Sequence, residues 1–346
     1  MNKPTITWSR GCVKLIDQTK LPVKLEYIYC RNVETLWEAI RRLSVRGAPA
    51  LGVAAAFGVL LGSKTFQGRD RQAFAAHIQR VSDYLATARP TAVNLFHGLD
   101  RMKKILEQHP EASVAELKKR LRQEAFAVYE EDRRVCRAMG RHGAALIQPK
   151  TSVMTICNAG ALATVDYGTA LGVMYAAKEE GKPFHVYACE TRPLLQGARL
   201  TAWELCRAGI DTTLICDSMA ANVLRDKSVS AVFTGADRIA RNGDSANKIG
   251  TYGLAVLAKY HRVPFYIVAP YSTFDMGIAS GKDIPIEERD RREVAEFAGL
   301  TTAPKKVKVF NPAFDVTPHT LISGIVTERG VIHPPFQTNI RKMFKV

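Results

Sequence analysis

TGADRIARNGDSANKIGT, residues Thr234–Thr251, joins two apolar segments of different periodicity. The segment before it, Ala231–Phe233, is a short continuous apolar run that predicts a strand. The segment after it, Tyr252–Tyr260, has apolar residues at helical spacing. We therefore expect a long polar loop between a strand and a helix. In a parallel α/β sheet, such loops leave the carboxyl ends of the strands, where ligands bind.

Two groups of polar residues in this loop point to a ligand site. Asp237 is expected close to the end of the strand, whereas Asn247 and Lys248 are expected where the helix begins. Free N–H groups at the start of a helix, beside a lysine, suit a phosphate. The residues alone equally allow a turn capped by Asp237 and a solvated Lys248, so both interpretations stay open here.

The chain around this loop alternates between short apolar runs and helical patterns from about Thr151 onward, which predicts βαβ units and a parallel sheet. No G-x-G-x-x-G or P-loop motif occurs at the turns, so a dinucleotide or nucleoside triphosphate site lacks support. The last helical pattern of this half is expected to be a solvated helix, IPIEERDRREV. The expected strands are VMTIC, HVYACETRP, DTTLICDSM, SAVFTGAD and PFYIVAP.

Polar or nucleophilic residues stand at the ends of four successive strands: Cys157, Glu190-Thr191-Arg192, Asp217 and Asp237. A doubly wound sheet gathers such residues at one crevice. A single cysteine at a strand end is more often a small core residue. Four such residues at successive strand ends favour a functional site at this edge of the sheet. Glu190, Arg192 and Asp217 either belong to this site or only orient the residues that do.

The first part of the chain has a different pattern. Short strands are expected up to about residue 30, including the alternating segment Val23–Tyr27, and helices are expected after it. The longest apolar run, Ala48–Gly62, is too short and too rich in Ala and Gly to span a bilayer, so we expect a buried helix. The helical patterns are VETLWEAIRRL, DRQAFAAHIQRVSDYLATAR, LFHGLDRMKKILEQ and the segment that begins at Ser113, an expected N-cap.

Two loops in this region carry arginines. Arg46 precedes Gly47 and Ala48 at the expected start of the apolar helix, where Pro49 fits the first helical position. An arginine beside exposed N–H groups suits a phosphate or a sugar, but a tight turn with a solvated arginine explains the same residues. Arg89 lies in a later loop and either binds a ligand or caps the preceding helix.

Composition limits the class of protein. The 346 residues are 47% hydrophobic and 24% charged, as in ordinary globular proteins, and the opening MNKPTITWSR lacks the apolar core of a signal peptide. Seven scattered cysteines without a C-x-x-C pair favour a reducing cytoplasm and disfavour a zinc site. The net charge of +16 is compatible with small phosphorylated anions, and no nucleic-acid-binding motif accompanies it. We therefore expect neither nucleic-acid nor membrane binding.

Five segments together resemble the methylthioribose-1-phosphate isomerases of methionine salvage. The wider family includes ribose-1,5-bisphosphate isomerases and the regulatory alpha, beta and delta subunits of the eukaryotic initiation-factor exchange complex. The resemblance runs from about Trp8 to Val331, without a departure at the motif positions. The segments are RGAPALGVAAAFG, ICNAGALATVDYGTALGV, ETRPLLQGARLTAWEL, TGADRIARNGDSANKIGT and NPAFDVTPHTLISGIVTERGVI.

The resemblance implies a smaller, mainly helical N-terminal domain with a few strands over residues 1–125 and a C-terminal Rossmann-like domain over residues 126–346. It also implies a homodimer and no metal or organic cofactor. Cys157 and Asp237 would be the catalytic pair. The residues implied to bind the phosphosugar are Arg46, Gly47, Ala48, Arg89, Gln196, Asn247 and Lys248.

The implied activity makes demands on the two catalytic residues. An acid is needed at the ring oxygen of the sugar, so we expect Asp237 to be buried and protonated. We expect the thiolate of Cys157 to be favoured by a helix N-terminus at Asn158-Ala159-Gly160. Two alternatives remain: isomerisation of 5-deoxyribose 1-phosphate or ribose 1,5-bisphosphate, and a non-catalytic regulator that binds a sugar phosphate or a nucleotide.

Overall fold

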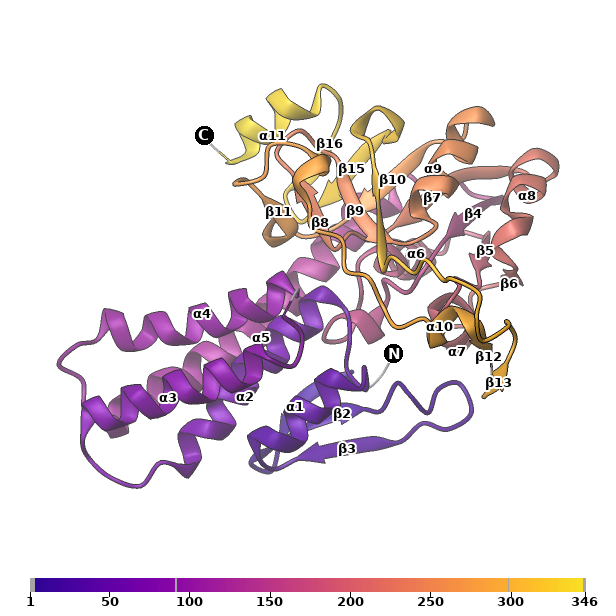
Figure 1. Ribbon diagram of the computed structural model, residues 1–346. Helices are drawn as coiled ribbons and strands as arrows, with labels where there is room; N and C mark the ends of the chain where they lie inside the picture. Colours follow the sequence, from indigo (N-terminus) through magenta and orange to yellow (C-terminus); the bar gives the residue numbers. More distant parts are fainter. Residues whose placement is uncertain (1–3, 91, 298, 345–346) are drawn as a thin grey trace. The chain divides into compact units, whose positions relative to one another are not determined.

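The computed structural model describes residues 4–90, 92–297 and 299–344 (Figure 1). The contacts within the chain define two compact units. The first consists of Met1–Cys136 and Gly160–Gly168, and the second of Arg137–Ala159 and Thr169–Val346. The boundary at residues 136/137 and the expected one at 125/126 both fall within one helix, α5 (Val114–Ala144).

The first unit is mainly helical and carries one small antiparallel sheet of order β1-β2-β3. This composition confirms the fold expected for the N-terminal part. Ser113 caps α5 as predicted, because its Oγ accepts a hydrogen bond from the Glu116 N–H at 3.2 Å. The elements are β1 (Ile6–Ser9), β2 (Cys12–Ile16), β3 (Tyr27–Cys30), α1 (Val33–Arg41), α2 (Ala48–Thr65), α3 (Arg71–Ala86), α4 (Val93–Gln108), α5 and a 3₁₀ turn at Ala161–Ala163.

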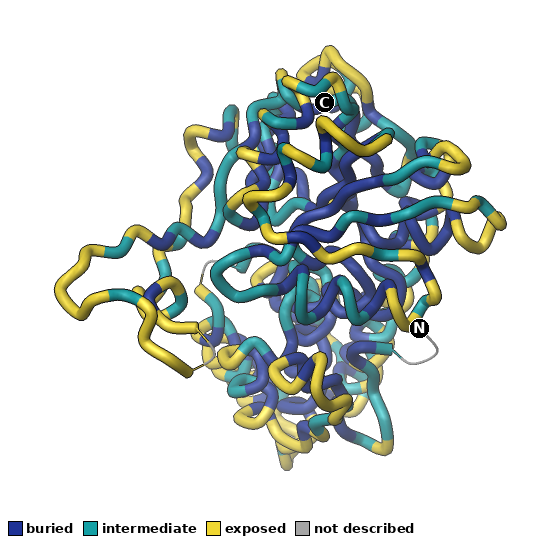
Figure 2. Tube along the Cα trace, turned by 90° about the vertical axis from the view of Figure 1, so that its right-hand side faces the viewer, coloured by how far each residue is buried: buried dark blue, intermediate teal, exposed yellow. Residues whose placement is uncertain are grey.

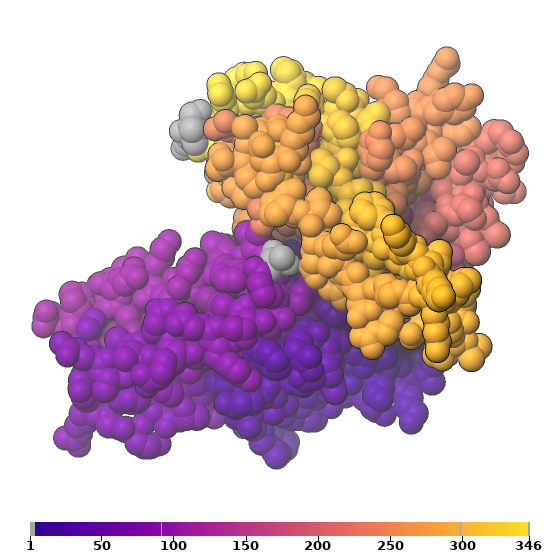
Figure 3. Space-filling model, in the orientation of Figure 1, coloured from indigo at the N-terminus to yellow at the C-terminus, as the bar shows by residue number. Residues whose placement is uncertain are grey.

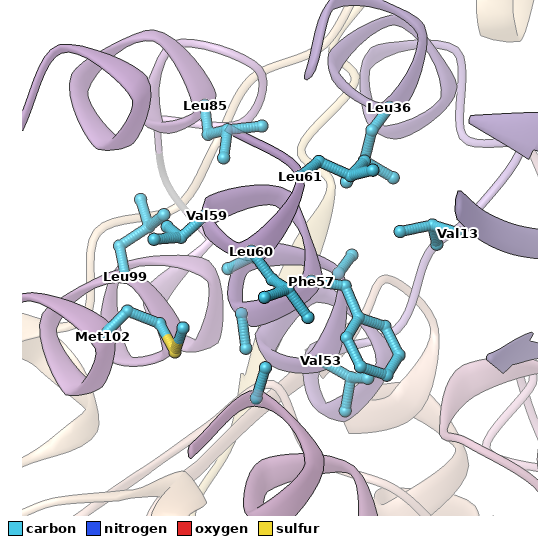
Figure 4. Close-up of a cluster of buried hydrophobic side chains, with 14 of the residues drawn as sticks. Val13, Leu36, Val53, Phe57, Val59, Leu60, Leu61, Leu85, Leu99 and Met102 are labelled. Carbon is cyan, nitrogen blue, oxygen red and sulfur yellow. The ribbon is translucent and has the colours of Figure 1, made fainter. Parts of the chain in front are cut away.

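Helix α2 is the centre of the core of the first unit (Figure 4). It is apolar around nearly its whole circumference, and it packs against α1, α3, α4 and the small sheet. Among the described residues it is the one helix long and apolar enough to cross a membrane, but 72% of it is buried inside the protein. The expectation of a buried core helix is therefore confirmed.

One expected strand of this unit is wrong. The alternation of apolar and charged residues in Val23–Tyr27 predicted a half-buried strand, but residues 21–26 form turns and irregular backbone, and β3 begins only at Tyr27. The side chain of Val23 is 86% exposed. Five residues of alternating pattern are too few to outweigh the turn geometry, which a backbone hydrogen bond from Lys24 to Lys20 holds at 3.0 Å.

The second unit alternates strands with helices, as predicted. Its elements from β4 to β7 form the first four strands of the main sheet and their connections. They are β4 (Thr151–Thr155), α6 (Ala170–Glu179), β5 (Phe184–Cys189), a π-helical turn (Gly197–Thr201), α7 (Ala202–Arg207), β6 (Thr212–Ile215), a 3₁₀ turn (Asp217–Met219), α8 (Ala220–Asp226) and β7 (Val229–Thr234). The later elements are β8 (Arg238–Ala240), β9 (Ser245–Lys248), α9 (Thr251–Tyr260), β10 (Phe265–Val268), a 3₁₀ turn (Tyr271–Thr273), β11 (Phe274–Asp275), a 3₁₀ turn (Gly281–Asp283), α10 (Arg292–Ala295), β12 (Glu296–Phe297), β13 (Leu300–Thr301), β14 (Phe314–Thr317), a 3₁₀ turn (His319–Leu321), β15 (Gly324–Thr327), β16 (Gly330–Ile332) and α11 (Phe336–Phe344).

The main sheet has seven strands in the order β16-β15-β10-β7-β4-β5-β6. All neighbours pair in parallel except β15 and β16, which pair antiparallel at one edge. Successive strands β4, β5 and β6 run to one side of β4, whereas β7, β10 and β15 run to the other. The order therefore reverses between β4 and β7. Buried residues predominate in the central strands β15, β10, β7 and β4, and exposed residues lie in the loops around the sheet (Figure 2). The predicted parallel-sheet fold is confirmed.

The stretch Thr234–Thr251 is more ordered than a loop. It contains β8 and β9, which pair antiparallel and join β11 and β14 in a second, four-stranded sheet. Asn247 and Lys248 lie in β9 rather than at the helix start, and α9 is preceded by Gly250, whose φ is 99°. The polar character of the stretch concealed a short hairpin because its side chains bond to the surrounding chain rather than to water.

The expected solvated helix over residues 284–294 is also largely wrong. Only Arg292–Ala295 is helical, and the rest is irregular backbone that belongs to an excursion on the surface of the second unit, part of the orange segment in Figure 3. Arg289 bonds to Glu287 and Glu293 at 2.9 and 2.7 Å. These ion pairs replace the helical contacts that the charged sequence had indicated.

Candidate functional site at the carboxyl edge of the sheet

The reversal of strand order places two candidate residues at neighbouring strand ends. Cys157 lies two residues after Thr155, the last residue of β4, and Asp237 lies three residues after Thr234, the last residue of β7. Because β4 and β7 pair in parallel, both residues leave the sheet at the same edge. This edge, at the point where the strand order reverses, is where open α/β sheets bind their ligands.

The backbone of Cys157 is held in an uncommon conformation. Its φ is 65°, in the left-handed region that residues with a side chain seldom adopt. Two threonine hydroxyls fix it: the Cys157 N–H donates to Thr191 Oγ at 2.8 Å, and Thr201 Oγ donates to the Cys157 carbonyl at 2.6 Å. The thiol itself is half-buried. Backbone strain that the surroundings maintain is common where a side chain must be aimed.

The expected helix N-terminus beside Cys157 is absent. The chain continues into the 3₁₀ turn at Ala161–Ala163, and α6 begins only at Ala170. Asn158 therefore supplies no free helical N–H group to the thiol. It is buried, and its side-chain amide points instead to Thr201 and Glu204.

A buried polar network lies beneath Cys157. The Asn158 amide donates to Glu204 Oε1 at 2.8 Å and to Thr201 Oγ at 3.2 Å. The Tyr175 hydroxyl donates to the other carboxyl oxygen of Glu204 at 2.8 Å. Both oxygens of this fully buried carboxyl group are thus engaged, which offsets the cost of removing it from water. Through Thr201, the network reaches the carbonyl of Cys157.

Asp217 acts on the same site from the 3₁₀ turn that follows β6. Its two carboxylate oxygens accept hydrogen bonds from the backbone N–H groups of Thr191 and Arg192, at 2.8 and 2.7 Å. Thr191 has a φ of 67°, so this carboxylate supports a second strained residue. Since the hydroxyl of Thr191 in turn accepts a hydrogen bond from the N–H of Cys157, Asp217 supports the backbone of the cysteine through Thr191.

The backbone of Glu190 and the side chain of Arg192 contact other parts of the chain. The backbone carbonyl of Glu190 accepts from the N–H groups of Gly197 and Ala198, both at 3.1 Å. The guanidinium of Arg192 donates to the carbonyl of Val294 at 3.1 Å and lies 5.5 Å from the ring of Phe297. Arg192 thereby connects the β5 loop to the surface excursion.

Asp237 lies at the base of the β8–β9 hairpin. Its backbone N–H donates to the carbonyl of Ala246 at 2.9 Å, which fixes the chain direction at this point. The residue is half-buried, whereas a fully buried carboxyl was expected. The loop carries it past the end of β7, so the side chain is not enclosed by the main sheet.

Lys248 is buried next to both candidates. Its ammonium donates to the Ala313 carbonyl at 2.7 Å and lies 4.7 Å from the ring of Phe314. Burial lowers the pKa of Lys248, and the charges of Cys157 and Asp237 act in the opposite direction. The thiol, the carboxyl and the ammonium therefore share one electrostatic environment. A buried ammonium beside a crevice suits a bound phosphate.

The neighbouring residues keep this lysine and its helix in place. The Asn247 amide donates to Thr251 Oγ at 3.0 Å. Asp315 on β14 accepts from the N–H groups of Gly250 and Tyr252 at 2.7 and 3.0 Å, so its carboxylate caps α9. Burial raises the pKa of Asp315 to about 6.

Gln196, one of the predicted ligand residues, has an unsatisfied hydrogen-bond acceptor in its side chain. It is buried, and its side-chain oxygen Oε1 has no hydrogen-bond partner. The adjacent Gly197 packs so closely on the carbonyl of Cys189 that a Cβ atom would overlap it, and such an atom would also lie 2.8 Å from Thr191 Oγ. Gln196 thus lies directly before a glycine that packs against Thr191, one of the two threonines that hold the backbone of Cys157. An unpaired buried acceptor is costly unless a ligand or water satisfies it.

The other predicted ligand residues belong to the first unit. Arg46, Gly47 and Ala48 are half-buried at the start of α2, one residue earlier than Pro49 had indicated. Gly47 has a φ of 93°, and a Cβ atom on it would overlap the backbone of Ala163. Only glycine fits this position. Arg89 is half-buried in the loop after α3 and accepts a backbone hydrogen bond from Ala92 at 3.0 Å.

Several supporting residues escaped the sequence interpretation. Thr201 and Glu204 lie three positions apart, a spacing that places them on one helix face, but nothing in the sequence indicates that this face is buried against Asn158. Asp315 stands within a recognisable motif, yet its partners are backbone groups more than sixty positions away. Within the described chain no cluster of three or more His, Cys, Asp or Glu side chains is arranged to hold a metal ion.

Comparison with known proteins identifies related chains. Residues 44–334 match the model of the initiation factor 2 subunit family. The chain is 53% identical to a methylthioribose-1-phosphate isomerase of Desulforamulus reducens, over 98% of both chains. It is also 53% identical to a 5-deoxyribose 1-phosphate isomerase of Moorella thermoacetica, over 98% of this chain and 96% of the other.

Solved structures with the same fold carry two kinds of name. A 5-methylthioribose 1-phosphate isomerase from Pyrococcus horikoshii OT3 superposes with a TM-score of 0.93 at 45% identity, over 99% of this chain and 96% of the other. A protein described as translation initiation factor eIF-2B, subunit delta, from A. fulgidus superposes with a TM-score of 0.90 at 49% identity, over 100% of both chains.

Proposed function

The chain belongs to the initiation factor 2 subunit family, and we propose that it is an isomerase that converts 5-methylthioribose 1-phosphate to 5-methylthioribulose 1-phosphate in methionine salvage. Relatives with the corresponding name are about half identical to it over nearly their whole length. The observation that carries the proposal is the pairing of β4 with β7, which brings Cys157 and Asp237 to one edge beside the buried Lys248.

The phosphate on C1 sets the chemical problem. In an ordinary aldose the ring opens through a free anomeric hydroxyl, but here that oxygen is esterified. The bond between C1 and the ring oxygen must break instead, while the phosphate stays in place. We assign the acid to Asp237: its carboxyl proton moves to the ring oxygen as this bond breaks, which leaves an oxocarbenium at C1 and a carboxylate on the enzyme.

The second part of the reaction moves hydrogen from C2 to C1. In one route the thiolate of Cys157 removes the C2 proton, and the electron pair forms a C1–C2 double bond. The proton then returns to C1, while the C2 hydroxyl gives its own proton to the carboxylate of Asp237. In the other route hydride shifts from C2 to the C1 cation, and Cys157 takes the C2 hydroxyl proton. Both routes convert the C2 alcohol to a ketone and restore the number of protons.

The remaining predicted residues hold the phosphosugar. Lys248 supplies a buried positive charge, Gln196 an unpaired amide oxygen, and Asn247 an amide on the adjacent position of β9. The resemblance assigns the same task to four residues of the first unit, Arg46, Gly47, Ala48 and Arg89. Holding the reacting atoms in one geometry is worth several orders of magnitude in rate.

The proposal includes the setting in which the enzyme works. We propose a cytoplasmic homodimer that acts without a metal or an organic cofactor. The seven cysteines are free thiols, which suits a reducing compartment. Sedimentation of the purified protein tests the dimer, and a molar mass of one chain across micromolar concentrations contradicts it.

Turnover of 5-methylthioribose 1-phosphate by the purified chain tests the activity, and substrate deuterated at C2 separates the two routes in ordinary water. Label retained at C1 of the product indicates hydride shift, and label lost to solvent indicates proton transfer. Absence of turnover contradicts the proposal. It is the result expected of a non-catalytic regulator, the alternative that the name of the A. fulgidus structure brings forward.

A second substrate has specific support, because a relative equally similar to this chain is named a 5-deoxyribose 1-phosphate isomerase. That sugar lacks only the methylthio group, and apolar pockets discriminate weakly between such neighbours, by roughly 10- to 200-fold per methylene-sized group. Side-by-side measurement of kcat/KM on the two sugars, with ribose 1,5-bisphosphate as a third, ranks them. A higher value for 5-deoxyribose 1-phosphate reassigns the substrate but not the chemistry.

A further inference from the structure

The first unit contains a hollow of about 570 Å³ that the proposed function does not use. Four basic side chains line it, from the β1–β2 turn, the end of α2 and the first part of α5: Arg10, Lys64, Lys118 and Arg122. Trp8 and Phe126 supply aromatic walls, and no carboxylate lines the hollow. We call this feature the basic hollow.

The four charges have no carboxylate partners. Within residues 4–90, 92–297 and 299–344, none of the four makes an ion pair, although basic residues on the same helix do. Arg120 pairs with Glu116 at 3.0 Å, and Arg133 pairs with Asp166 at 2.7 Å. Four like charges around one space repel each other, and a bound anion relieves this repulsion.

Neutral groups hold the cations of the basic hollow in position. The Lys64 ammonium donates to the Gly11 carbonyl at 2.6 Å, and the Lys118 ammonium donates to the Phe66 carbonyl at 2.8 Å. Each ammonium has three donors, so each can offer two more to a ligand. The Arg122 guanidinium lies 5.1 Å from the centre of the Phe126 ring. These contacts fix the charges without neutralising them.

The turn that presents Arg10 is equally well defined. Ser9 and Cys12 pair in the β1–β2 register, so Arg10 and Gly11 form a two-residue hairpin turn. Both have positive φ values, 50° and 79°, as a type I′ turn requires. Its carbonyl at Gly11 is the acceptor for Lys64. The turn and the lysine therefore fix each other at the rim of the hollow.

We propose that the basic hollow binds a small organic phosphate with at least two negative charges. Lysine and arginine donors at fixed positions match the several acceptor oxygens of a phosphate. The aromatic walls favour an organic group over inorganic phosphate alone. The volume lies within the roughly 300–1,000 Å³ range of small-molecule sites. None of the residues assigned to the isomerase reaction lines this hollow, so the proposal goes beyond that function.

Equilibrium dialysis of the full-length protein against adenosine monophosphate tests the proposal. At neutral pH this probe carries close to two negative charges and a flat apolar group. We expect binding to the wild type and at least about tenfold weaker binding to the double variant K118Q/R122Q, because two charged donors are lost. Adenosine, which lacks the phosphate, is expected not to bind measurably.

A second double variant, K119Q/R134Q, provides the matched control. It removes the same two charges from exposed positions of the same helix that do not line the hollow. We expect its affinity for adenosine monophosphate to stay within about twofold of the wild type. Equal affinities of the two double variants, binding of adenosine as tight as that of the monophosphate, or no binding to the wild type at millimolar concentration would each overturn the proposal. Circular dichroism melts confirm that both variants fold.

Discussion

The core around α2 in the first unit and the carboxyl edge of the sheet in the second both exclude water, but they bury different groups. The side chains around α2 are nearly all apolar, and its backbone hydrogen bonds lie within the helix. The edge of the sheet buries Asn158, Glu204 and Lys248, and it leaves Gln196 Oε1 without a partner. The first arrangement maximises stability, whereas the second sacrifices some of it to place polar groups.

The backbones differ in the same way. In α2 every residue is helical, but three residues with side chains near the sheet edge have positive φ values: Cys157, Thr191 and Leu195. Each such residue costs roughly 1–3 kcal/mol. Hydrogen bonds to Thr201 and Asp217 maintain two of them. The comparison teaches that strain and unpaired polar atoms, rather than depth of burial, distinguish the candidate site from the core.

The largest expected effect is on catalysis at the sheet edge. Asp237→Asn removes the proposed acid while preserving the shape of the side chain, so we expect kcat to fall by about 10²- to 10⁴-fold. The melting temperature should change little, because the carboxyl is half-buried. Steady-state kinetics on 5-methylthioribose 1-phosphate measure the loss. Asp211→Asn, at an exposed ion pair with His185, is the control and should retain wild-type turnover. Near-normal turnover of Asp237→Asn would remove this residue from its role.

The core should respond to truncation with a loss of stability. Phe57 is fully buried in α2, with aromatic neighbours Trp8, Phe126 and Tyr129 within 6 Å between ring centres. Phe57→Ala should lower the free energy of unfolding of the first unit by about 3–5 kcal/mol. Urea unfolding monitored by fluorescence measures it.

The matched truncation is Phe310→Ala, at a side chain that is 80% exposed. It should change the free energy of unfolding by less than about 0.5 kcal/mol. Equal effects of the two substitutions would contradict the assignment of the core. A loss of turnover in folded Phe57→Ala protein as large as that of Asp237→Asn would contradict the view that the core affects stability and the sheet edge affects catalysis.

A smaller effect is expected from a positioning residue. Asp217 accepts two backbone hydrogen bonds, and Asp217→Asn can accept only one while it turns an N–H group toward the other donor. We expect kcat to fall by about tenfold, the change that roughly 1–3 kcal/mol of lost support at Thr191 and Cys157 permits. KM should change less. Asp226→Asn removes an equivalent charge at an exposed site and should have no effect. A rise in KM with unchanged kcat would contradict the positioning role.

The last expected effect concerns pH and a carboxyl of α5, and it bears on stability rather than on catalysis. Burial raises the pKa of Asp132 from 3.8 to about 7, so the folded protein binds this proton more tightly than the unfolded chain. The stabilising contribution of the proton is complete below about pH 4 and is lost as the pH rises through 7. Asp132→Asn cannot ionise, yet it keeps an acceptor for the Val165 N–H, which lies 2.7 Å away.

Melting curves between about pH 5.5 and 8.5 test this linkage. The melting temperature of Asp132→Asn should rise relative to the wild type up to about pH 7 and should level off above it, where the carboxyl is ionised in both the folded and the unfolded chain. Asp83→Asn, at an exposed position that accepts a hydrogen bond from Gln79, should keep a constant difference. A constant difference for Asp132→Asn as well would mean that the carboxyl does not titrate in this range.

Some of these features follow from sequence and some do not. The βαβ alternation and the apolar helix Ala48–Thr65 depend on local periodicity, so both could be predicted. The predicted strand over Val23–Tyr27 and the predicted helix over residues 284–294 were wrong. Turn geometry in the first segment and ion pairs in the second outweighed the short periodic patterns on which the predictions depended. The hairpin β8–β9 was missed because its side chains are polar yet find partners inside the protein.

The candidate site likewise has features that the sequence predicts and features that it does not. Cys157 and Asp237 stand at strand ends, a position that the sequence reveals, but their adjacency depends on the strand order, which it does not. In place of the expected helix N-terminus beside Cys157, two threonine hydroxyls hold its backbone, one from the loop after β5 and one from the π-helical turn Gly197–Thr201. Supports of this kind join residues far apart in sequence. Only the folded chain identifies them.

The most direct test is a crystal structure of the Asp237→Asn variant with 5-methylthioribose 1-phosphate bound. We predict that one furanose ring lies between the two candidates, with the side chain at position 237 within about 3.2 Å of the ring oxygen and the sulfur of Cys157 within about 4 Å of C2 or its hydroxyl. A sugar bound elsewhere, or a sulfur and a side chain at position 237 that face separate cavities, would contradict the account.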